Sequence, residues 1–175
     1  SAQLGAIATA KITALETVDV AALASAQIGG LSLGQFQELT SHQVASLSSA
    51  AVKGLVSGQI NALGTAKIGG LSSLTISALS SLQLIGFSTA QLALFGSSQI
   101  AALGSASIVG LSTAQVDSLS TMNLASLSSL NIKGLSSAQL LVINTAKISA
   151  LEAVDVAALL SAQFRGFSTA QLQQF

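Results

Sequence analysis

An eight-residue repeat runs along almost the whole chain and limits its fold more than any other feature. From Ile7 to Gln174 the sequence divides into 21 octads without insertion or deletion. Typical octads are LSTAQVDS, which begins at Leu111, and FSTAQLQQ, which begins at Phe167. A short fixed period is typical of solenoids, in which each repeat packs only against its neighbours. We therefore predict one continuous octapeptide-repeat solenoid over residues 1–175, as a segment of a longer chain.

The eight positions of the octad, numbered here as columns one to eight from Ile7, differ in chemistry. Column one is Leu, Ile or Phe and column six is Ile, Val, Leu or Phe in all 21 octads. Column three is Ser or Thr in 19 octads, and column five is Gln in 11. Column four is mostly small, and column eight is mostly Gly, Ala or Ser. Columns one and six are therefore predicted to form the core.

A longer period is superimposed on the octad. The block TAKITALETVDVAALASAQ at Thr9 returns as TAKISALEAVDVAALLSAQ at Thr145, and a more distant copy begins at Thr65. Successive copies are seven and ten octads apart, and these spacings differ by three octads. Column-eight glycines Gly86 and Gly110 also lie three octads apart. Both observations favour a triangular solenoid with 24-residue coils. The alternative is a flattened solenoid with two octads per coil, to which the 16-residue spacing of Gly54, Gly70 and Gly86 corresponds.

The residue types within the octad favour an all-β fold, a parallel β-solenoid. Fourteen of the 21 column-six residues are β-branched, and such side chains fit pleated strands better than helices. Column five accepts Asp19 and Asn123, which are poor residues for a helix interior. In this interpretation columns one, four and six point inward, columns two, three and five point outward, and column eight forms a tight corner.

The alternative is a solenoid of short capped helices. With column two, often Ser, as the N-cap residue, Gln in column five is N3 and completes a capping box. Columns one and six then take the positions of a hydrophobic staple. Against this alternative, Ser and Thr are commonest in column three, one place from the required position.

The octads resemble a family of LTTAQ(I/V)-type tandem repeats found in large bacterial secreted and surface proteins, which are described as adhesin-like or β-strand-repeat proteins. The motifs that carry the resemblance are Ser112-Thr113-Ala114-Gln115-Val116 and Ser168-Thr169-Ala170-Gln171-Leu172. The resemblance extends over the whole chain. It implies an extracellular or cell-surface structural role and assigns no catalytic residue.

The chain offers little for catalysis or ligand binding, so we predict no catalytic, cofactor-binding or metal-binding residues and no enzyme. His42 is the only histidine and stands in column four, where we expect it at a widened part of the core or at a coil edge. The acidic pairs Glu16/Asp19 and Glu152/Asp155 are expected to be solvated neighbours of Lys11 and Lys147 rather than a calcium site. Column three holds 11 Ser and eight Thr in irregular order, which argues against a threonine-rich ice-binding face.

Composition narrows the class of function. Only 7% of residues are charged and the net charge is zero, so no nucleic-acid partner is expected. Polar residues interrupt every apolar run, which argues against a membrane span. We predict a rigid stalk, fibre or matrix filament that self-associates end to end, or laterally through outward apolar residues of column seven. The alternative is an adhesin-type module that binds carbohydrate or ice. The predicted outward residues of column seven include Ala21, Ile85, Val109 and Leu141.

Overall fold

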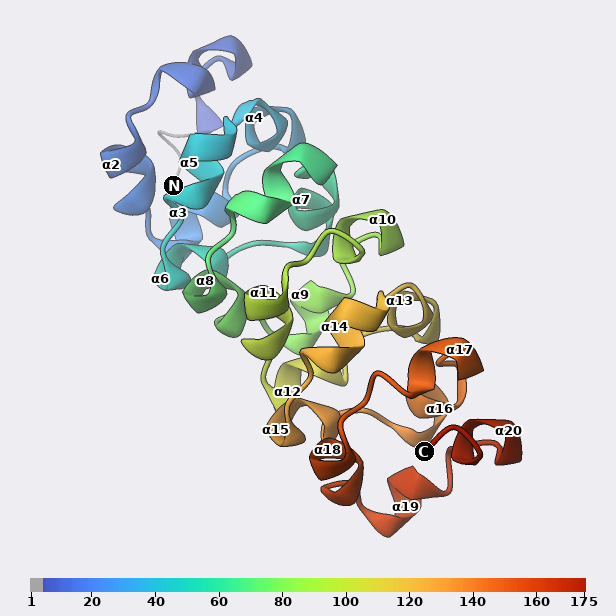
Figure 1. Cartoon of the computed structure of the whole chain (residues 1–175). Coiled ribbons are helices and arrows are strands. Elements are labelled where there is room, and N and C mark those ends of the chain that lie inside the picture. Colours follow the sequence, from blue (N-terminus) through green and yellow to red (C-terminus); the bar gives the residue numbers. More distant parts are fainter. Residues whose placement is uncertain (1–4) are drawn as a thin grey trace.

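The structure is a computed structural model that describes residues 5–175, and it is a long stack of short helices (Figure 1). Each of the 21 octads forms one helix of four to six residues, and the described residues contain no β-strand. Helices of one face are η1 (Thr9–Ala14), α4 (Leu33–Glu38), α7 (Ser57–Ala62), α9 (Ser81–Leu84), α12 (Ser105–Ile108), α15 (Ser129–Ile132) and α18 (Ala153–Ala157). Those of the second face are α2 (Thr17–Ala21), α5 (Ser41–Ala45), η2 (Thr65–Gly70), α10 (Thr89–Leu92), α13 (Thr113–Asp117), α16 (Ser137–Leu141) and α19 (Ser161–Phe164). The third face consists of α3 (Ser25–Gly29), α6 (Ser49–Val52), α8 (Ser73–Ser77), α11 (Ser97–Ala101), α14 (Thr121–Ala125), α17 (Thr145–Ile148) and α20 (Thr169–Leu172).

Three octads make one turn of the solenoid. Each helix packs on the helices that lie three octads before and after it, as α4 does with η1 and α7. The same spacing relates α9 to α12, α13 to α16 and α17 to α20. The faces rotate about the long axis. Figure 1 shows this for the second face, whose helices α2, α5, α10 and α13 pass from one side of the view to the other. The molecule is therefore a twisted, three-faced helical solenoid.

The predicted β-solenoid is wrong, and a β-helix does not describe this protein. The structure has the short capped helices of the alternative, because side chains within the octad satisfy the first backbone groups of each helix. In α13 the Ser112 hydroxyl accepts a hydrogen bond from the Gln115 backbone N–H (3.2 Å). The Gln115 side-chain oxygen accepts one from the Ser112 backbone N–H (2.7 Å). This reciprocal pair makes the column-two residue the N-cap of the helix. Ser or Thr of column three is then the first residue of the helix itself.

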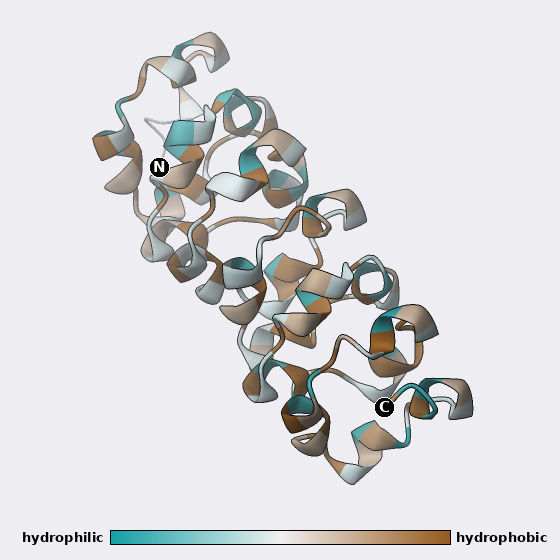
Figure 2. Cartoon of the chain, in the orientation of Figure 1, coloured by the Kyte–Doolittle hydropathy of each residue, from teal (hydrophilic) through white to brown (hydrophobic). Residues whose placement is uncertain are grey.

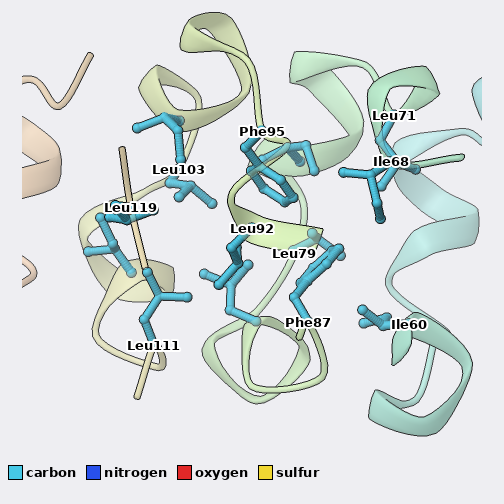
Figure 3. Packing of buried hydrophobic residues seen from close by; sticks show 14 of the residues in the cluster. Ile60, Ile68, Leu71, Leu79, Phe87, Leu92, Phe95, Leu103, Leu111 and Leu119 are labelled. Atoms are coloured by element: carbon cyan, nitrogen blue, oxygen red, sulfur yellow. The ribbon is translucent and has the colours of Figure 1, made fainter. Parts of the chain in front are cut away.

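Columns one and six form the core, as predicted from their invariant apolar character. Column-six side chains from Ile12 to Ile148 are at most 1% exposed, and most column-one side chains are buried with them. Figure 3 shows side chains of successive turns pointing into a shared interior. Phe87 and Phe95, which belong to consecutive octads, meet edge to face with ring centroids 5.2 Å apart. Apolar residues recur in every turn along the whole stack (Figure 2).

Two other columns point the opposite way from the prediction. Column four, expected inside, is at the surface, and His42 is accordingly exposed instead of lying in a widened core. Column five, expected outside, is buried in most octads, with Gln91 and Asn131 as examples. The period-two alternation inferred for columns four to six applies to a strand. In a helix, columns five and six are successive residues that both face the neighbouring turn or the core.

Column eight is restricted by close packing between turns. A Cβ atom added to Gly110 would lie 2.1 Å from the backbone oxygen of Ser81, which belongs to the turn below. At Gly54 the corresponding distance, to the Ser25 oxygen, is 1.9 Å. Small residues are therefore needed at these positions because helices approach closely, and not because the chain turns a strand corner. Among residues 5–175, none of the helices has the length and apolarity required to cross a lipid bilayer.

Candidate functional site

Buried amides of column five are the most regular polar feature of the molecule. The Gln115 side-chain nitrogen donates to the carbonyl oxygens of Leu84 (3.0 Å) and Phe87 (2.6 Å), which belong to the preceding turn. Gln59 makes the same pair of bonds to Ile28 (3.0 Å) and Leu31 (2.8 Å). These carbonyls lie where the chain leaves one helix and enters the next octad. Each glutamine therefore caps its own helix with its oxygen and joins two turns with its nitrogen.

Other residue types take over the inter-turn contact where column five is not glutamine. Asn123 donates to the Phe95 carbonyl at 2.7 Å, and the Thr75 hydroxyl donates to the Leu47 carbonyl at 3.1 Å. The Lys147 ammonium group donates to the carbonyls of Asp117 (2.7 Å) and Leu119 (3.1 Å). From Gln35 onward, column five thus supplies a donor that reaches the preceding turn, except at Ala51 and at Asp155, which accepts from the Ser129 hydroxyl. This role of column five cannot be predicted from a single octad, because the accepting carbonyls lie between three and four octads earlier in the sequence.

The duplicated acidic pairs differ from each other in burial. Glu16, Asp19 and Glu152 are exposed, whereas Asp155 is buried and accepts a hydrogen bond from the Ser129 hydroxyl at 2.8 Å. Within the described part of the chain, no three His, Cys, Asp or Glu side chains are grouped closely enough to hold a metal ion. Lys11, Glu16 and Asp19 are all exposed, as expected of solvated side chains, whereas Lys147 bonds to backbone carbonyls of the preceding turn and Asp155 is buried.

The outer surface carries large apolar side chains on columns four and seven. The face that contains α9, α12 and α15, called face A below, has the most of them. Ile85 and Val109 of column seven are about half exposed, as predicted, and Leu141 is similarly exposed on another face. Exposed apolar side chains of this size mark possible contact surfaces. The exposed large apolar residues of face A are Leu33, Val56, Leu82, Ile85, Val109, Leu130 and Val154.

The C-terminal end of the stack leaves part of the core uncovered. A hollow of about 770 Å³ lies there, lined in part by Leu151, Val156 and Leu159. Phe164, a column-six residue, is 43% exposed, whereas column-six residues of the inner turns are fully buried. Phe175 is 49% exposed and meets Phe167 edge to face at 5.3 Å. These apolar side chains line an open hollow at this end of the described residues.

Comparison with known proteins finds a similar repeat family. A family model described as the ALTTAQ repeat matches residues 12–49. The match confirms that the chain is a tandem-repeat protein, and it does not address the adhesin-like context that we inferred. No curated protein and no solved structure is detectably similar to the chain.

Proposed function

We propose that this segment is a rigid structural spacer, a rod whose length is set by the number of octads. The observation that carries the proposal is the series of column-five hydrogen bonds between turns, which runs from Gln35 to Gln171 and is interrupted at Ala51. Most of these column-five side chains are buried beside a continuous apolar core, so bending between two turns would break polar and apolar contacts at once. A non-catalytic role at the cell surface or in an extracellular matrix is part of this proposal.

Rigidity can be tested with distance measurements across the rod. Ala26 and Ala146 are exposed column-four residues of one face, five turns apart, and the sequence contains no cysteine. We expect spin labels on the Ala26→Cys/Ala146→Cys variant to be about 40–50 Å apart, since packed helix axes are roughly 8–10 Å apart. A single narrow distance distribution is expected. A broad distribution, in a variant that keeps its helical circular dichroism spectrum, would refute a rigid spacer.

The second candidate function is a binding module of the adhesin type. It is favoured by the contrast between the constant core and the variable outer surface. Column four ranges from Gly58 to Leu82 and Met122 at exposed positions, although columns one and six stay apolar throughout. Outward variation on a fixed scaffold is the usual way in which solenoids display binding surfaces.

A glycan array and an ice-affinity assay distinguish this candidate from a pure spacer. The matched variant is Leu82→Ser/Leu130→Ser, which removes two exposed apolar side chains of face A and leaves the core intact. Saturable binding that the double variant weakens would support a binding module. Equal, nonspecific retention of both proteins, or no retention, would leave the spacer as the better description.

A further inference from the structure

The middle turns of face A form an uncharged apolar surface. The octads of its helices α7, α9 and α12 contain no charged residue, and every residue between Lys67 and Asp117 is uncharged. The first charges on either side along this face are Glu38, the last residue of α4, and Lys133, which directly follows α15. Both are exposed. The surface is therefore bounded along the rod by an acidic residue on one side and a basic residue on the other.

Six large aliphatic side chains stand out from this part of face A. Leu82 at its centre is 72% exposed, and the other five are at least half exposed. Complete burial of such a side chain removes on the order of 100 Å² from water, so one copy offers roughly 350 Å² of apolar side-chain area. A contact between two copies would bury about 1,200 Å² in total, since a little more than half of an interface is apolar, and this is the lower end of the range for stable contacts. The six residues are Leu33, Val56, Leu82, Ile85, Val109 and Leu130.

The charges of face A match a second copy of the chain when the two rods run in opposite directions. With α9 of one copy on α9 of the other, an antiparallel pair brings α4 opposite α15 and α7 opposite α12, because these helices lie two turns and one turn from α9. Glu38 of each copy then stands opposite Lys133 of the other. A parallel pair would bring Glu38 opposite Glu38 and Lys133 opposite Lys133. Charge complementarity therefore favours the antiparallel arrangement.

Side-chain size agrees with the same arrangement. With the two-fold axis along α9, column four of one copy faces column four of the other. The exposed Leu130 then lies opposite Gly34, which has no side chain to obstruct it. Gly58 faces Ala106, so small residues flank the centre, where the Leu82 side chains of the two copies meet. The largest side chains are thus opposed by a gap or lie on the axis itself.

The twist of the solenoid limits the size of this contact. The faces rotate about the long axis (Figure 1), so two stiff rods can follow each other over only a few turns and must cross at an angle. Beyond α4 and α15 the two copies of face A diverge. The contact uses the same patch on both copies and is isologous, so it closes as a dimer. Turns added before or after this patch would not cover it, because the patch lies on the side of the rod.

We propose that face A joins two copies of this chain as an antiparallel dimer of crossed rods, with α9 of both copies at its centre. Of the two modes of self-association predicted from the sequence, this is the lateral one. Leu82 and Ile85 supply the apolar contacts at the centre, and the pairs of Glu38 with Lys133 at the rim set the relative direction of the rods. This inference goes beyond the spacer role, because a spacer needs no second rod.

Sedimentation velocity over a concentration series tests the apolar centre. The unmodified protein should pass from monomer to dimer and form nothing larger. Leu82→Glu places two carboxylates at the two-fold axis and should raise the dissociation constant about tenfold or more, as for loss of a central anchor. Leu74→Glu is the matched control, because Leu74 occupies the same column, is 69% exposed and belongs to α8 of another face. Its dissociation constant should equal that of the unmodified protein.

Charge reversal tests the direction of the rods. Glu38→Lys and Lys133→Glu each place like charges at both rims, so each variant alone should dimerise about threefold or more weakly at low ionic strength. An equimolar mixture of the two variants restores opposite charges, as does the Glu38→Lys/Lys133→Glu double variant. Both should regain the affinity of the unmodified protein. In a parallel pair, a single reversal would replace one like-charge pair by another and leave the affinity unchanged.

Several outcomes would overturn the proposal. These are an unmodified protein that stays monomeric at the highest concentration, growth beyond the dimer, and equal losses for Leu82→Glu and Leu74→Glu. Single charge reversals without effect would also overturn it, as would failure of the mixture and of the double variant to regain affinity. A monomer that still gives a narrow spin-label distance would remove the dimer and leave the spacer role standing.

Discussion

At the residue scale, the buried amide of column five explains more of this fold than any other side chain. Its oxygen caps one helix and its nitrogen satisfies carbonyls of the turn below, as Gln115 does for Leu84 and Phe87. Carbonyls buried between helices must find donors, since an unpaired buried polar group costs about 1–3 kcal/mol. Glutamine is long enough to reach two carbonyls, and asparagine in the same column reaches one. The polar column is thus part of the core.

Replacement of Gln115 tests this role. Gln115→Leu keeps the volume but leaves the two carbonyls without a donor, so we expect a loss of at least about 1–3 kcal/mol in the free energy of unfolding. Urea denaturation followed by circular dichroism measures it. Gln115→Asn is the matched control and should lose less, because the Asn123 amide both accepts from the Ser120 backbone N–H and makes one inter-turn bond. Equal losses for the two variants would contradict the proposed role.

Close packing at column eight gives a second prediction at this scale. Gly110→Ala would place a Cβ atom 2.1 Å from the Ser81 backbone oxygen, so the two helices must separate. We expect a loss of about 1–3 kcal/mol, as for other overpacked sites. Gly69→Ala is the control, because a Cβ atom added there would have no neighbour within 4 Å. The Gly69→Ala variant should be neutral or slightly stabilising. Thermal unfolding of both variants is the measurement, and a similar loss in both would show that close packing at Gly110 is not the cause.

At the element scale, the helices are too short to be stable alone. Isolated helices below about 12–15 residues are marginal in water, whereas these have four to six residues. Capping at one end and burial of columns one and six must therefore supply their stability. A β-branched residue in a helix costs at most about 0.7 kcal/mol, but burial of its side chain contributes about 1.5–3 kcal/mol. Ile108 and Val116 thus occupy helices although their intrinsic preference is for strands.

This balance also explains what the sequence could and could not reveal. The repeat, the core columns, the turn of three octads and the capping box with Gln115 as N3 are all visible in the sequence. The choice of helix over strand depends on tertiary burial at residues such as Val116, which local preference opposes. The inward position of Gln115 depends on carbonyls of the preceding turn, beyond the reach of any pattern within one repeat. The prediction for His42 is wrong for a different reason, because the period-two alternation of a strand places column four in the core, whereas in this helix it lies at the surface.

The cap can be tested separately from the core. Ser112→Ala removes the hydroxyl that accepts from the Gln115 N–H, and we expect a loss of about 0.5–2 kcal/mol in unfolding free energy. Thr113→Ala, one residue later at an exposed first helical position, is the control and should be neutral or stabilising. The two variants differ by one position in the octad. Comparable destabilisation by both would mean that the helix does not begin where the structure places it.

At the scale of the whole molecule, the octad is the unit of sequence but the turn of three octads is the unit of packing. The main helix contacts between turns join octads that stand three apart in the sequence, as those of Gly134 and Ser105 do. The three faces are not equivalent, since they differ in which octads carry column-eight glycine. Deletion of a whole three-octad turn should therefore be tolerated better than deletion of a single octad.

Two deletions test this distinction. Removal of residues 111–134 takes out one turn, after which Gln139 replaces Gln115 and meets the carbonyls of Leu84 and Phe87. Removal of residues 111–118 takes out one octad and moves the branched Val142 to the place of Gly134, beside the Ser105 oxygen, whereas the 24-residue deletion moves the smaller Ala158 there. We expect the one-octad deletion to be less stable by about 1–3 kcal/mol despite its longer chain, because the larger side chain overpacks this face more strongly. Parallel urea denaturation provides the comparison. Equal stability, or an order set by chain length alone, would show that the octad and not the three-octad turn governs packing.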